Sequence, residues 1–85
     1  MTLNELEKIR EEFIIFLDWW GKLSKTHTQT KLAKDIKNHG ITDFGNSMIT
    51  KTKNRDGKPS VVLGTVYSYL KNTYPKYFEE VAIKH

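Results

Sequence analysis

Four basic side chains lie close together in the middle of the chain and have the right chemistry to neutralise phosphate groups. They are Lys51, Lys53, Arg55 and Lys58, and the only acid within residues 51–58 is Asp56. Like charges at this spacing repel one another, and a polyanion relieves that repulsion. Each phosphate that a Lys or Arg neutralises also releases condensed counterions, which favours binding of nucleic acid. This segment is therefore a candidate docking surface for a phosphate backbone.

Polar side chains on either side of this cluster could add hydrogen bonds to phosphates or base edges. Thr50 and Thr52 carry hydroxyls suited to phosphate, and backbone amides near Thr28 and Thr30 could hold another phosphate at the start of a helix. Asn46 and the adjacent serine are the best candidates for base edges. The predicted DNA-binding residues are Thr28, Thr30, Lys31, Asn46, Ser47, Thr50, Lys51, Lys53, Asn54, Arg55 and Lys58.

The net charge of +4 is unevenly distributed along the chain. Residues 1–21 carry two basic and five acidic side chains, a balance of −3, whereas residues 22–58 carry nine basic and three acidic ones, a balance of +6. Positive charge concentrated in this way is typical of an electrostatic docking surface. The alternative interpretation is a lysine-rich surface that only keeps the protein in solution.

The histidines and glutamates of the sequence do not have the spacing of metal ligands or of catalytic acid–base pairs. His27, His39 and His85 lack the spacing of metal ligands. Glu11-Glu12 and Glu79-Glu80 are adjacent pairs whose side chains diverge on a helix, unlike a general acid–base pair. No glycine-rich phosphate loop is present. We therefore expect a protein that is not an enzyme, with no metal, no cofactor and no small-molecule substrate.

Length and composition predict a single domain spanning residues 1–85, located in the cytoplasm. The chain has no cysteine, which excludes disulfides and thiolate zinc sites. Its N-terminal residues include acids where a signal peptide has positive charge. The longest apolar run, residues 13–17, is far shorter than the roughly 20 residues of a membrane span.

The elements that would position these residues begin with three helices. Apolar residues at spacings of three and four predict a helix over residues 3–21, ending at Gly21. A second helix over residues 29–38 follows, with Thr28 or Thr26 as its N-cap. A short third helix is predicted over residues 43–49.

A β-hairpin is expected next. Alternating strand-favouring residues over 49–53, an Asn-Arg-Asp-Gly turn and residues 58–63 predict two strands. A helix over residues 65–73 and a last helical turn over residues 76–81 complete the predicted elements, separated by Pro75.

This order of elements resembles a winged helix-turn-helix domain over residues 5–74. The Thr28-Gln29-Thr30-Lys31-Leu32-Ala33 segment looks like the start of its supporting helix, and residues 43–49 would be a recognition helix that is shorter than usual. The resemblance implies an α+β, mostly helical fold with three to four helices and one two-stranded hairpin. It also implies binding of double-stranded DNA, as a transcription regulator or as an accessory factor in replication, recombination or DNA transfer of a mobile element.

Three alternatives remain open from the sequence. The lysines could simply protect an edge hairpin from aggregation. The protein could instead be an interaction module or inhibitor encoded by a phage or plasmid, using its first helix with Trp19 and Trp20. It also resembles the small helical-plus-hairpin domain at the end of some viral replicative helicases. The wide apolar arc of the first helix, which includes Ile14 and Ile15, further suggests a homodimer.

Overall fold

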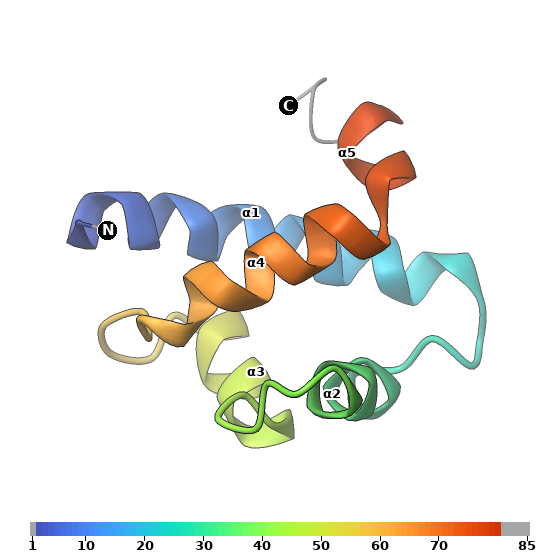
Figure 1. The fold of residues 1–85 in the computed structure, drawn as a ribbon, viewed down its shortest axis with the longest axis horizontal. Helices are drawn as coiled ribbons and strands as arrows, with labels where there is room; N and C mark the ends of the chain where they lie inside the picture. The colour runs from blue at the N-terminus through green and yellow to red at the C-terminus, as the bar shows by residue number, and fades with distance from the viewer. Residues whose placement is uncertain (1, 81–85) are drawn as a thin grey trace.

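The computed structural model describes residues 2–80 and contains five helices in this range (Figure 1). α4 crosses in front of α1 and packs against it more extensively than any other pair of helices does, while α2 and α3 lie together on one side (Figure 1). No residue between 2 and 80 lies in a strand. The helices are α1 (Leu3–Leu23), α2 (Gln29–Asn38), α3 (Asn46–Lys53), α4 (Val62–Thr73) and α5 (Pro75–Glu80).

The first helix begins at a capping box and continues past its predicted end. The Thr2 side chain accepts the Glu5 backbone N–H at 3.2 Å, and the Glu5 carboxylate accepts the Thr2 backbone N–H at 3.4 Å. The helix was predicted to stop at Gly21, and this is wrong: α1 continues to Leu23. Gly21 is exposed and has no left-handed backbone, and Lys22 pairs with Asp18 one turn earlier at 2.8 Å. The last turn of α1 is therefore continuous.

The predicted α+β fold, with a winged helix-turn-helix and a two-stranded hairpin, is wrong, because α3 covers the first predicted strand and the second is divided between a loop, residues 58–61, and the start of α4. Residues 49–53 lie in α3, and residues 62 and 63 open α4. Both helices bury residues at helical spacing: Ile49 and the polar Thr52 in α3, and Leu63, Val66, Tyr67 and Leu70 in α4. Contact with the core therefore favours helices in these two segments, although their β-branched residues prefer strands.

Two threonine hydroxyls make the helical form of α3 locally acceptable. Thr52 Oγ1 donates to the Met48 carbonyl at 2.7 Å, and Thr50 Oγ1 donates to the Asn46 carbonyl at 3.2 Å. Each bond joins residues four apart, which is a geometry that only a helix provides. The Thr52 hydroxyl, predicted to contact phosphate, is instead buried and satisfied within α3.

The Asn-Arg-Asp-Gly turn is present, but it connects two helices rather than two strands. Arg55 and Gly57 have left-handed backbone, with φ of 55° and 72°. The chain closes over the end of α3 because the Asp56 N–H donates to the Lys51 carbonyl at 2.9 Å. The predicted turn is therefore confirmed, but the strands predicted on either side of it are wrong.

Aromatic residues from α1, α4 and α5 fill the core. Phe16 lies at the centre of this cluster, with its ring 5.1 Å from the Tyr77 ring and 5.6 Å from the Tyr74 ring. Trp20 is only 2% exposed, and Phe44 from the loop before α3 stacks edge-on against Phe13 at 5.5 Å. The inward residues predicted for α2 are all buried: Leu32, Ala33 and Ile36.

The end of the described chain differs slightly from the prediction. The last helical turn, predicted over residues 76–81, is α5 and begins at Pro75; Val81 lies outside the described residues. Within residues 2–80, the structure has no helix with the combination of length and apolar composition that a membrane crossing requires.

Candidate nucleic-acid interface

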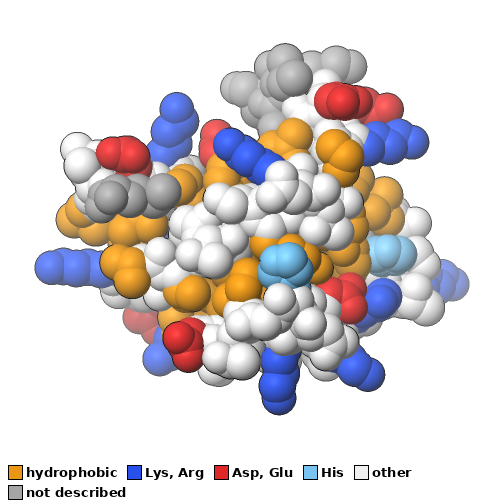
Figure 2. Space-filling view, in the orientation of Figure 1, with side chains coloured by type: hydrophobic (Ala, Val, Ile, Leu, Met, Phe, Trp, Pro, Cys, Tyr) orange, Lys and Arg blue, Asp and Glu red, His pale blue; other side chains and the backbone are white. Residues whose placement is uncertain are grey.

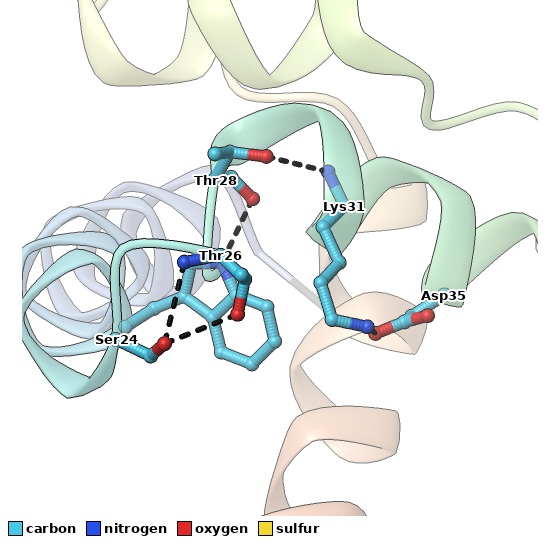
Figure 3. Close-up of polar contacts among 6 residues, drawn as sticks. Ser24, Thr26, Thr28, Lys31 and Asp35 are labelled. Atoms are coloured by element: carbon cyan, nitrogen blue, oxygen red, sulfur yellow. Dashed lines mark hydrogen bonds and ion pairs between the residues drawn. The ribbon is translucent and has the colours of Figure 1, made fainter.

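The start of α2 is held rigidly against the end of α1 (Figure 3). Of the two predicted N-cap candidates, Thr28 is the N-cap, and its hydroxyl accepts the Lys31 N–H at 3.1 Å. The Thr28 carbonyl accepts a hydrogen bond from the indole N–H of Trp20 at 2.9 Å. In the connecting loop, the Thr26 N–H donates to Ser24 Oγ at 3.3 Å. The predicted residues at the start of α2 are therefore fixed relative to the core.

A hydrogen-bond network joins the start of α2 to α3. The Gln29 Nε2 group lies 2.7 Å from Asn46 Oδ1, 2.7 Å from Thr50 Oγ1 and 3.2 Å from the Asn46 carbonyl. Asn46 Nδ2 in turn lies 3.4 Å from Thr30 Oγ1. This network brings together three residues that the sequence proposed separately: Thr30, Asn46 and Thr50.

The outward face of α3 is polar and free of acids. Its core-facing residues are Ile49 and Thr52, with Met48 partly buried beside them. The exposed residues of α3 and its C-cap are Asn46, Ser47, Thr50, Lys51, Lys53 and Asn54. Residues 44–55 contain no Asp or Glu. Figure 2 shows Lys and Arg side chains projecting along the lower edge of the view, where α2 and α3 lie.

α2 also carries exposed lysines. Lys34 and Lys37 are exposed. Lys31 is also exposed, but its Nζ lies 3.5 Å from a carboxylate oxygen of Asp35, one turn further along α2 (Figure 3). An exposed pair of this kind contributes little to stability, so the lysine can exchange its carboxylate for a phosphate at low cost.

Arg55 does not project from a wing tip. Its guanidinium holds the Glu11 carboxylate with two nitrogens, at 2.8 Å from Nε to Oε2 and 2.6 Å from Nη2 to Oε1. These hydrogen bonds lower the pKa of Glu11, and the charge of Arg55 is neutralised. The predicted entry of Arg55 into a minor groove relied on a hairpin that is absent. Lys58 was predicted on a strand but lies in the loop between α3 and α4.

Two residues that position this region were missed at the sequence level. For Gln29 the sequence predicts only a place at the start of a helix. For Arg10 it predicts only a positive charge on the acidic first helix. Arg10 Nη1 donates to the Gly57 carbonyl at 2.9 Å and so ties α1 to the loop after α3. No local sequence signal marks either contact, because the partners are 17 to 47 residues away.

A largely apolar groove of about 450 Å³ lies between the end of α1, the start of α2 and the end of α3. Its lining includes Ile14, Leu17, Trp20, His27 and Lys53. The tryptophan pair itself is not a free surface, because Trp20 is buried and the Trp19 ring packs 5.0 Å from the Tyr77 ring. Trp19 and Ile15 pack against the core, so the apolar arc proposed for dimerisation is mostly covered by this chain itself.

Residues 2–80 contain no group of three His, Cys, Asp or Glu side chains placed to hold a metal ion. Comparison with protein families, with curated protein sequences and with solved structures gives no match. Functional inference therefore depends on the geometry of α2, α3 and the loops around them.

Proposed function

We propose that this protein binds double-stranded DNA without catalysing a reaction, using the outward face of α3 together with the start of α2. The observation that carries the proposal is the acid-free face of α3, on which Gln29 orients Asn46 and Thr50 beside two exposed lysines. Asparagine can pair with the edge of adenine, and lysine and hydroxyl groups contact phosphates. The proposed biological role is that of a small regulator or accessory factor acting on DNA.

The dimensions of α3 suit a major groove. An α-helix with its side chains is about 10–12 Å in diameter, and the major groove of B-DNA is about 12 Å wide. α2 is seen nearly end-on in Figure 1 while α3 runs up toward α1, so the two helices cross steeply. In helix-turn-helix proteins the second helix enters the groove and the first crosses the backbone. Here the connection, residues 39–45, is longer than the usual three to four residues.

The size of this surface sets the expected strength of binding. A single small module buries about 600–1,000 Å² on DNA, and part of its contact here would be to phosphates. With about four phosphates neutralised, affinity should fall on the order of 100-fold between 50 and 200 mM salt. We therefore expect modest affinity with strong salt dependence.

A fluorescence-anisotropy titration with labelled duplexes at these two salt concentrations tests the proposal. The informative variant is Lys51→Ala/Lys53→Ala, which removes two positive charges from α3. The matched control is Lys71→Ala/Lys76→Ala, which removes two exposed lysines from α4 and α5. We expect the α3 variant to lose at least tenfold in affinity and the control to stay within about twofold of wild type, since α3 would lie on the duplex whereas α4 and α5 would not.

Absence of binding by the wild-type protein at low salt would reject the proposal. Equal losses in both variants would show that total charge, rather than α3, drives the interaction. Retention of a folded state is checked for each variant by circular dichroism. If DNA binding fails, the groove beside the end of α1, with Ile14, Leu17 and Trp20, becomes the feature to test with protein partners.

A further inference from the structure

A small pocket of about 230 Å³ lies between α1, α3 and the loop that leads to α4. Its charged and polar lining comprises Arg10, Lys51, Thr52, Asp56, Lys58 and Ser60, together with Gly57. Pockets that hold whole drug-sized ligands are usually 300–1,000 Å³. This pocket therefore suits a single small group rather than an entire nucleotide.

The pocket has an excess of positive charge. Three cationic side chains face a single carboxylate, and the first turn of α4 beside it carries no acidic residue. Arg55 does not contribute to this excess, because Glu11 neutralises it. The chemistry of the lining therefore selects an anion.

Arg10 has donor capacity left over inside the protein. One terminal nitrogen, Nη1, is bonded to the Gly57 carbonyl, but Nε is enclosed and has no hydrogen-bond partner among the described residues. Arginine binds an anionic oxygen through strong, charge-assisted hydrogen bonds. Ser60 Oγ accepts the Val62 N–H at 3.3 Å, which leaves its own hydrogen free to donate.

Contacts within the protein hold the loop that forms the pocket. Arg10 and Glu11, adjacent on α1, hold Gly57 and Arg55 respectively, and the Asp56 N–H bonds back to the Lys51 carbonyl. Contacts from two helices thus fix the loop on both sides. A preorganised site loses little conformational entropy when its ligand binds.

We propose that this pocket binds a phosphate group, and specifically a backbone phosphate of the DNA that α3 contacts. Lys51 belongs to both the outward face of α3 and the pocket, so a duplex on α3 would pass its backbone beside Arg10 and Lys58. This inference rests on the proposed function for its source of phosphate. The pocket itself rests only on its own lining and on the enclosed Arg10 donor.

The test uses Lys58, which lines the pocket but is not on α3. Lys58→Ala should weaken duplex binding several-fold and reduce the slope of log K against log salt by about 0.9, the value for one phosphate contact. Lys76→Ala, an exposed lysine on α5, is the matched single-charge control and should change neither. Lys58→Arg should restore binding, because it returns the positive charge to the pocket.

Several outcomes separate the pocket from the proposed function. If wild type binds duplex and Lys58→Ala behaves like Lys76→Ala, the pocket proposal is overturned and DNA binding stands. If wild type binds no duplex, inorganic phosphate is titrated while the amide signals of Gly57 and Ser60 are followed by NMR. Shifts that Lys58→Ala abolishes would keep a phosphate pocket but reject DNA as its source, and absence of shifts would reject the pocket.

Discussion

At the residue scale, Gln29 has the largest organising effect on the candidate interface. Its amide nitrogen has two hydrogens and lies within hydrogen-bonding distance of three oxygens on α3. It thereby fixes the rotamer of Asn46 and joins the first turn of α2 to the first turn of α3. Preorganised side chains bind more tightly than mobile ones, since fewer rotamers are lost on binding.

Replacing Gln29 tests this role without changing charge. In Gln29→Ala we expect duplex affinity to fall about fivefold, because roughly 1 kcal/mol of hydrogen bonding that orients Asn46 and Thr50 is lost. The salt dependence should stay the same, since no phosphate contact is removed. Anisotropy titrations at two salt concentrations measure both quantities.

The control for this prediction is Asn38→Ala, which removes an exposed amide from the other end of α2. It should leave affinity within about twofold of wild type. A Gln29→Ala protein that binds DNA as tightly as the control would show that the network has only a structural role.

At the element scale, the segment 49–63 shows how local preference and tertiary contact compete. Its β-branched residues and Asp-Gly turn are typical of a hairpin, yet two helices form because Ile49 and Leu63 reach the core only from helical positions. The surface consequence is large. The lysines that a hairpin would have carried on projecting strands lie instead on α3 and on a loop held by α1.

The extension of α1 through Gly21 gives a prediction about stability. Gly21→Ala should raise the free energy of unfolding by about 0.5 kcal/mol, because alanine loses less backbone entropy in a helix. A Cβ at this position meets no atom within 4 Å. Urea denaturation followed by circular dichroism measures the change.

Gly40→Ala provides a comparison of opposite sign. Gly40 has φ of 110°, which an alanine adopts only with strain, so this variant should lose about 1 kcal/mol or more. If Gly21→Ala were also destabilising, α1 would have to end before Gly21 in solution.

At the scale of the whole molecule, the aromatic cluster holds α1, α4 and α5 together. Tyr74 ends α4 and packs against Phe16 and Trp20, with ring centroids 5.6 Å and 5.5 Å away. Burial raises the pKa of Tyr74 to about 12, and it also raises the pKa of Tyr67, Tyr69 and Tyr77. The folded state therefore favours neutral tyrosines.

This coupling predicts loss of stability at high pH. An unfolded tyrosine has a pKa near 10, so the stabilisation is complete below pH 10 and declines as pH rises toward the folded pKa of about 12. Tyr74→Phe keeps the ring but removes the hydroxyl that titrates. In this variant the free energy of unfolding should fall less steeply with pH, by a slope that corresponds to at most one proton. Urea denaturation at a series of pH values between 8 and 12 measures both slopes.

Identical slopes in wild type and Tyr74→Phe would contradict the burial of this hydroxyl. The two proteins should have similar stability at pH 8, where tyrosine is neutral in both the folded and the unfolded state. That comparison distinguishes the titration effect from any loss of packing.

Features that depend on neighbours along the chain could be predicted from the sequence. Periodicity located α1, α2 and most of α4, Thr28 was identified as an N-cap, and the turn at residues 54–57 was recognised. These follow from side-chain spacing and backbone preference, which act over a few residues. The concentration of basic residues in the middle of the chain was equally visible.

The secondary structure of residues 49–63 and the surroundings of each candidate residue depend on long-range packing and could not be predicted from the sequence. Burial of Ile49 and Leu63 against α1 favours helix over strand, and it removes the predicted wing. The pairing of Arg55 with Glu11 and the bonds from Gln29 to α3 join residues distant in sequence. Such contacts depend on the packing of whole helices, which no local pattern encodes.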